Sequence, residues 1–77
     1  MKIEILGTGC AKCRKLAEVT EQAAKELGQP YELVKVTDLR KISGYGVMIT
    51  PALVVDGEVK LAGKVPSVVE AKGLLAP

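Results

Sequence analysis

The spacing of hydrophobic residues along the chain predicts a strand, a long helix and a second strand. Residues 2–6 alternate loosely between apolar and polar side chains and are rich in isoleucine, which predicts a buried strand. Gly7-Thr8-Gly9 breaks this strand, because glycine permits backbone angles that other residues resist. From Cys10 onwards, mostly apolar residues recur three and four positions apart, which predicts a helix. Its apolar face carries Cys13, Leu16, Ala17, Thr20, Ala23, Ala24 and Leu27. Gly28 followed by Pro30 ends that helix.

The middle of the chain continues as a second strand and a short helix. Residues 31–36 predict a strand, so the first three elements form a βαβ unit, which is parallel and right-handed in nearly all known cases. Thr37 or Asp38 can cap a short helix over residues 39–43. Residues 45–50 are expected to be a loop or an extended segment.

The last third predicts a hairpin followed by a helix. Pro51 opens the strand 52–55, Asp56-Gly57 is a strong signal for a two-residue turn, and residues 58–61 return as the partner strand. Pro66 is expected in the first turn of a final helix, which carries Val68, Val69, Lys72 and Leu75 on adjoining turns. The predicted fold is α/β, with the order β-α-β-α-β-β-α and a four-stranded mixed sheet flanked by helices.

Composition narrows the class of protein. Seventy-seven residues predict a single domain over 1–77 with a thin core, because so short a chain buries only roughly 60–65% of its unfolded surface. Aliphatic residues must fill the core, since the chain lacks Trp and Phe. The net charge is +2 with acids and bases interleaved, and the Arg14-Lys15 and Arg40-Lys41 pairs are interpreted as solvated surface. We therefore expect no nucleic-acid partner.

The first residues of the chain help to predict the cellular compartment of the protein. Glu4 interrupts the first apolar run at once, which disfavours a secretory signal. No stretch approaches the ~20 apolar residues of a membrane span, so no membrane partner is expected. The expected compartment is the cytoplasm, where a structural disulfide is unusual. The two cysteines are more informative for that reason.

Cys10-Ala11-Lys12-Cys13 is the one constellation with obvious chemistry, because the chain contains no His and its carboxylates are scattered. Cys10 falls at a helix start, where unsatisfied backbone N–H groups and the helix dipole stabilise a thiolate. Thiols of CxxC motifs at such positions have pKa values of roughly 3.5–7.5, against about 8.5 for a free thiol. Lys12 adds positive charge. We expect Cys10 to be the nucleophile and the more buried Cys13 to resolve the mixed disulfide.

Two alternatives stay open from the residues. The same thiolates could hold a soft metal such as Cu(I), in a binding or carrier domain. A zinc site would need four ligands and therefore a dimer, so no metal site is assigned to one chain. Cys13 could instead be a core residue and Cys10 incidental.

Two segments resemble the thioredoxin-fold superfamily, most closely its small archaeal and bacterial redox-active disulfide proteins, over essentially the whole chain. They are residues 9–13, around the cysteines, and residues 47–57, which resemble the superfamily's cis-proline segment. The resemblance implies a cis Thr50–Pro51 bond beside the cysteines, and a substrate groove formed by Thr50, Pro51 and Ile49. From the residues alone, a trans Pro51 at the start of a strand is favoured, because cis X–Pro bonds are a minority in folded proteins.

The resemblance also implies an activity and partners. The activity is the exchange of electrons with protein disulfides, and the electrons come from an upstream, flavin-dependent reductase. The resemblance implies no bound cofactor beyond the Cys10–Cys13 disulfide itself. In thioredoxins a buried acid assists proton transfer, and Glu4 is the only candidate nearby. Departures are the Ala11-Lys12 pair between the cysteines, which matches neither thioredoxins nor glutaredoxins, and a turn at 62–65 without the Asp that binds glutathione. Soft-metal domains of similar length follow the order βαββαβ, which ends in a strand.

Overall fold

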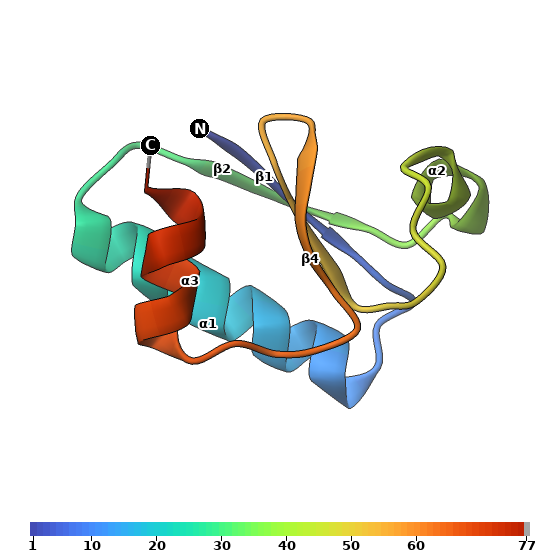
Figure 1. The fold of residues 1–77 in the computed structure, drawn as a ribbon, viewed down its shortest axis with the longest axis horizontal. Helices are drawn as coiled ribbons and strands as arrows, with labels where there is room; N and C mark the ends of the chain where they lie inside the picture. The colour runs from blue at the N-terminus through green and yellow to red at the C-terminus, as the bar shows by residue number, and fades with distance from the viewer. Residues whose placement is uncertain (77) are drawn as a thin grey trace.

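The computed structural model describes residues 1–76 as one mixed sheet with helices on both faces (Figure 1). The elements are β1 (Lys2–Leu6), α1 (Ala11–Leu27), β2 (Glu32–Val36), α2 (Leu39–Gly44), β3 (Ala52–Val55), β4 (Glu58–Ala62) and α3 (Val68–Leu75). The sheet order is β2-β1-β3-β4, with β1 parallel to β2 and the other pairs antiparallel. The predicted element order and the mixed four-stranded sheet are confirmed.

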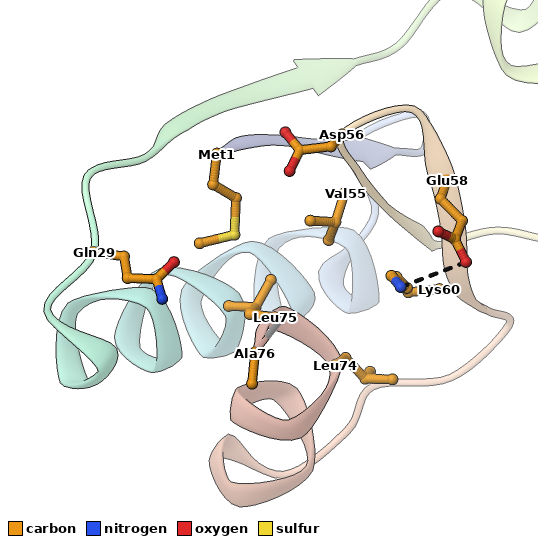
Figure 2. Close-up of a pocket in the computed structure, with 9 residues that line it drawn as sticks. All are labelled: Met1, Gln29, Val55, Asp56, Glu58, Lys60, Leu74, Leu75 and Ala76. Carbon is orange, nitrogen blue, oxygen red and sulfur yellow. Dashed lines mark ion pairs between the residues drawn. The ribbon is translucent and has the colours of Figure 1, made fainter.

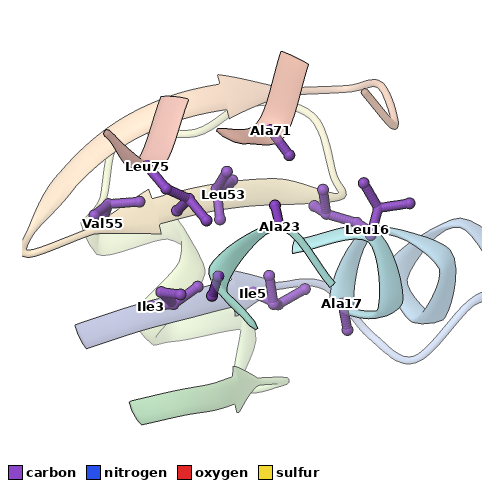
Figure 3. Close-up of a cluster of buried hydrophobic side chains, with 11 residues drawn as sticks. Ile3, Ile5, Leu16, Ala17, Ala23, Leu53, Val55, Ala71 and Leu75 are labelled. Atoms are coloured by element: carbon purple, nitrogen blue, oxygen red, sulfur yellow. The ribbon is translucent and has the colours of Figure 1, made fainter. Parts of the chain in front are cut away.

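Alternation along β1 divides the core between the two faces of the sheet. Ile3 and Ile5 point toward α1 and α3, and the register pairs them with Val55 and Leu53 of β3. Figure 3 shows this larger cluster, in which side chains of α1 and α3 meet those of β1 and β3. The opposite face carries a smaller cluster under α2, made of Leu6, Val36, Ile42, Ala52 and Val54. The central strand is therefore covered on both sides, which fixes the position of its carboxyl end.

Helix α1 begins and ends where its sequence predicts. Cys10 is the N-cap in extended backbone, and the N–H of Arg14 donates to its carbonyl at 3.1 Å. Gly28 adopts a left-handed φ of 70° and its N–H donates to the Lys25 carbonyl at 3.1 Å. Only glycine takes this conformation without a steric penalty, so the helix ends there.

The start of α3 corrects the prediction for Pro66. Pro66 lies before the helix, not in its first turn, because Ser67 is the N-cap. The Ser67 hydroxyl accepts from the Glu70 N–H at 3.1 Å, and the Glu70 carboxylate accepts from the Ser67 N–H at 3.2 Å. This capping box satisfies two end groups of the helix and fixes Val68 as its first residue. Of the residues that α3 carries, Ala71 and Leu75 are buried, whereas Val69 is 78% exposed.

Within residues 1–76, no helix combines the length and the apolar character needed to cross a bilayer.

Candidate active site

The two cysteines lie where the central strand β1 meets α1. The N–H of Gly7 still donates to the Val36 carbonyl at 3.0 Å, so the chain stays in the sheet up to that residue. Gly9 then adopts a φ of 92°, which turns the chain into the helix N-terminus at Cys10. In Figure 1 this turn lies at the end of the molecule away from both termini. The motif is therefore held between a buried strand and a long helix, which limits its freedom to move.

The two thiols differ in exposure and lie in contact. Cys10 is exposed, whereas Cys13, one turn along α1, is buried with 5% of its surface accessible. Both cysteines are free, and their Sγ atoms are 2.9 Å apart. The predicted difference in burial is thus present, and oxidation can join the sulfurs with little movement.

The pKa of the Cys10 thiol is lowered, mainly because the Cys13 thiol donates a hydrogen bond to it. The next contribution comes from the backbone N–H of Cys13, and a smaller one from the backbone N–H of Lys12; together they outweigh desolvation. No capping hydrogen bond to the Cys10 side chain forms, so these N–H groups act at longer range. The ammonium group of Lys12 is not among the causes, and its tuning role stays a prediction.

The segment before β3 approaches the cysteines from the other side. The Thr50–Pro51 peptide bond is cis, Pro51 is fully buried, and Thr50 is exposed. Because Leu6 pairs with Ala52, Pro51 stands beside Gly7, and its Cα lies 3.9 Å from where a Gly7 Cβ would be. The structure therefore brings Pro51 to the same strand end as the cysteine motif.

Gly7 and Gly63, which each follow a strand directly, lie where a side chain would collide with a neighbour. A Cβ on Gly7 would overlap the Sγ of Cys13, so only glycine leaves room for that sulfur. At Gly63 a Cβ would come within 3.0 Å of the Ile49 side chain, and the Gly63 N–H donates to the Pro51 carbonyl at 2.7 Å. Ile49 is 58% exposed above this contact. The sequence signal for both was a glycine directly flanking a strand.

The buried acid on β1 has a partner that the sequence did not indicate. Glu4 is buried, and the Tyr45 hydroxyl donates to its Oε2 at 2.5 Å. This hydrogen bond raises the pKa of Tyr45, assisted by burial and by the charge of Glu4. Tyr45 packs with the α2-side cluster, so Glu4 is engaged on that face of the sheet and not with either thiol.

A pocket lies at the end of the molecule opposite to the two cysteines (Figure 2). It measures about 230 Å³ and includes Met1, the hairpin turn and the end of α3. Its charged groups pair locally: Lys60 lies 3.4 Å from Glu58, and Asp56 accepts from the Lys2 N–H at 2.8 Å. It contains neither cysteine, so the chemistry lies elsewhere.

The possible metal ligands around the motif are few. Among residues 1–76, no group of three or more His, Cys, Asp or Glu side chains is placed to hold a metal ion. The described chain also ends in α3, which differs from the βαββαβ order of soft-metal domains.

Comparison with known proteins agrees with the site. A family model described as the thioredoxin domain matches residues 1–76. The thioredoxin of Methanothermobacter thermautotrophicus is 43% identical over 76 residues, which cover 99% of each chain. The thioredoxin of Methanocaldococcus jannaschii is 44% identical over 70 residues, covering 91% of this chain and 80% of that protein. By these matches and its Cys10-x-x-Cys13 motif, the chain belongs to the thioredoxin-domain family and is a thiol–disulfide oxidoreductase.

Proposed function

We propose that Cys10 is the attacking nucleophile on protein disulfides and that Cys13 resolves the resulting mixed disulfide. The observation that carries this order is the asymmetry of the pair. Cys10 is exposed and its pKa is lowered, so it forms a thiolate more readily than an ordinary thiol and a substrate disulfide can reach it. Cys13 is buried behind it with the sulfurs 2.9 Å apart, which suits a thiol that reacts only with its neighbour.

The reaction proceeds in two exchanges. The Cys10 thiolate attacks one sulfur of the substrate disulfide, the substrate S–S bond breaks, and the released substrate thiolate takes a proton from solvent. Cys13 then loses its proton, and its thiolate attacks the Cys10 sulfur of the mixed disulfide. That step forms the Cys10–Cys13 disulfide and releases the second substrate thiolate. Two electrons pass from the dithiol to the substrate, and no further cofactor takes part.

Ile49, Thr50 and Pro51 form the substrate groove in this proposal. Ile49 and Thr50 are exposed immediately before the buried Pro51, which stands beside the strand end that carries the cysteines. The exposed side chain of Ile49 offers apolar surface to an extended substrate segment, and the backbone of Thr50 offers hydrogen-bonding groups. The contact of Ile49 with Gly63 supports a fixed position for this surface.

Three further assignments belong to the same proposal. The ammonium group of Lys12 adds positive charge beside the thiolate, so Lys12→Gln is expected to raise the pKa of Cys10. Thioredoxins receive electrons from a reductase, and for this chain we propose a flavin-dependent one. The oxidoreductase then acts in the cytoplasm, where both its reductase and its reduced state are maintained.

The test is reduction of insulin disulfides with dithiothreitol as electron donor. Wild type is expected to accelerate the reaction, and Cys10→Ser to abolish the acceleration. Cys13→Ser is expected to accumulate a covalent complex with substrate through Cys10, visible by mass spectrometry and released by excess dithiothreitol. Ser43→Ala, an exposed change on α2, is the matched control and should behave as wild type. A complex trapped through Cys13 in the Cys10→Ser variant, but not through Cys10, would reverse the assigned order.

A further inference from the structure

The charged side chains differ between the two ends of the molecule. At the cysteine end, Lys12, Arg14 and Lys15 lie in the first turns of α1, Lys35 lies near the end of β2, and all four are exposed. Toward the opposite end, acids and bases are paired with one another. Within residues 1–76 the ion pairs join Lys25 to Glu21 at 3.9 Å, Lys60 to Glu58 at 3.4 Å and Lys72 to Glu26 at 3.2 Å. The unpaired positive charge is thus concentrated around the cysteine motif.

Carboxylates do little to offset these four cations. Within residues 1–76, none of the four has a carboxylate at ion-pair distance. The first turn of α1 carries no acidic residue, so the positive end of the helix dipole adds to their charge. Glu18 follows Arg14 by one turn without pairing with it, and the Asp38 carboxylate caps α2 by accepting from the Arg40 N–H at 2.8 Å. The potential at this end is therefore positive.

The cations of α1 lie around its exposed surface. Successive residues of a helix are about 100° apart, and Cys13 is the residue that faces the core. Lys12 and Arg14 therefore flank Cys13 on opposite sides of the helix, and Lys15 projects toward solvent. A substrate that reaches the exposed Cys10 at the helix start meets positive charge on either side.

The sheet shows which side each cation occupies. Arg14 and Lys35 line one pocket together with Gly9, the residue before Cys10, so Arg14 lies on the β2 side of α1. Lys12, on the other side of the helix, then lies toward β3 and the groove residues 49–51. The positive surface extends from the edge strand β2, across the helix start, to the proposed substrate groove.

We propose that this positive surface, formed by Lys12, Arg14, Lys15 and Lys35, docks acidic proteins, so that Cys10 reacts preferentially with disulfides flanked by Asp or Glu. The proposal rests on the proposed function, because it names the class of substrate for the same thiol. A positive surface around a reactive group attracts an acidic partner before contact and raises the rate of encounter by roughly 10- to 1,000-fold. The chemical exchange between Cys10, Cys13 and the substrate is unchanged.

The chemistry of the surface favours a protein over a nucleic acid. A nucleic acid offers no disulfide to Cys10, and single strands are bound by stacking their bases on exposed aromatic rings. Tyr31 and Tyr45 are the only aromatic residues of the chain. Both are partly buried, and their hydroxyls donate to Glu21 and Glu4. Carboxylates on a folded protein need only the charge-assisted hydrogen bonds that Lys and Arg supply.

The test measures kcat/KM for two peptides that each carry one disulfide. They differ only in the residues next to the cysteines, which are glutamate in one and lysine in the other. The ratio of the two values, divided by the ratio for dithiothreitol alone, cancels the intrinsic reactivity of each peptide. Wild type is expected to prefer the acidic peptide about tenfold at low ionic strength. The preference should disappear near 1 M salt, where charges are screened beyond about 3 Å.

Substitutions assign the preference to this surface. Arg14→Gln and Lys35→Gln are each expected to lower it about threefold, and the triple variant that adds Lys15→Gln should bring it close to one. The ratio is insensitive to a changed Cys10 pKa, because both peptides react with the same thiolate. Lys2→Gln is the matched control. It removes an exposed cation at the far end of β1, which forms no ion pair within residues 1–76, and should keep the wild-type ratio.

Three results would overturn the inference. The triple variant could keep the wild-type preference, or Lys2→Gln could lower it equally, in which case net charge and not this surface sets the rate. A short DNA duplex could inhibit reduction of both peptides at about 0.15 M salt and lose this effect in the triple variant, which would assign the surface to a nucleic acid. Failure of the proposed function differs from all three, because wild type would then reduce neither peptide.

Discussion

The sulfur of Cys13 packs against the backbone of Gly7 so closely that no Cβ fits between them. A methyl group at Gly7 would overlap Sγ and stand 3.3 Å from the Cβ of Cys13. Gly7→Ala is therefore expected to destabilise the protein by about 1–3 kcal/mol, the usual cost of overpacking a buried site. It should also push the Cys13 thiol away from Cys10 and raise the pKa of Cys10. Denaturant unfolding and the pH dependence of Cys10 alkylation measure the two effects.

Gly73→Ala is the matched control for that substitution. Gly73 lies within α3, with open space where its Cβ would be and no left-handed backbone angle. Alanine there should stabilise the protein by about 0.5–1 kcal/mol, because glycine in a helix costs that much relative to alanine. The Cys10 pKa should not change. Equal effects of the two substitutions on alkylation would show that Gly7 does not position Cys13.

The hydrogen bond from Cys13 makes a second prediction about Cys10. Because this bond is the largest cause of the lowered pKa, Cys13→Ala should raise the pKa of Cys10 toward the usual value of about 8.5. Cys13→Ser retains a hydroxyl donor at the same place and should raise it less. The pH at the midpoint of Cys10 alkylation is expected to be lowest in wild type, higher in the serine variant and highest in the alanine variant. A common midpoint for all three would mean that the helix N-terminus alone sets the pKa.

Tyr45 and Glu4 predict a distinct behaviour in alkali. The pKa of Tyr45 is raised, so its neutral form stabilises the fold fully below the unfolded value of about 10, and this contribution is lost as the pH rises through the higher folded value. In a Tyr31→Phe background Tyr45 is the sole phenol, and its ultraviolet titration is expected above the usual range. Adding Glu4→Gln removes the facing charge and should lower that midpoint. An unchanged midpoint would contradict the role of Glu4.

The hydrophobic pattern was sufficient to predict the helices and strands, but not the contacts between them. The apolar face of α1 and the turn at Asp56-Gly57 are local signals, and both predicted their elements correctly. The turn works because Asp56 and Gly57 both adopt positive φ, at 49° and 84°. The Tyr45–Glu4 bond joins residues 41 positions apart, and no local pattern indicates such a pair.

The site was also predicted only in part, because the sequence pattern indicates local structure and not the contacts between distant residues. The spacing of Cys10 and Cys13 placed one thiol at a helix start and the other on its apolar face, and their exposures follow that placement. The role of Gly7 depends on how close the strand end lies to α1, which is a property of the packed fold. Cys13 also lines a pocket together with Lys35 of β2, and the register of β2 with β1 is set by long-range pairing.

The capping box at Ser67 predicts a measurable contribution to stability. Ser67→Ala removes the acceptor for the Glu70 N–H and should cost about 1 kcal/mol, the typical loss for a serine N-cap. Ser43 is the other serine in the chain, lies exposed within α2, and serves as the control through Ser43→Ala. Chemical denaturation should separate the two variants. A Ser67→Ala protein as stable as Ser43→Ala would mean that Pro66 alone is enough to start α3.

Ile49 predicts where substrate affinity resides. It is 58% exposed, and covering the free part of an isoleucine is worth about 1 kcal/mol, so Ile49→Ala should lower kcat/KM for insulin about fivefold. The loss should fall on KM, because Ile49 lies outside the cysteine pair and its truncation leaves the Cys10 thiolate unchanged. Val69→Ala, which shortens an apolar side chain that is 78% exposed on α3, is the control and should leave both constants as they are. A fall in kcat at constant KM would instead place Ile49 in the exchange step, through its contact with Gly63 and the adjoining Pro51 segment.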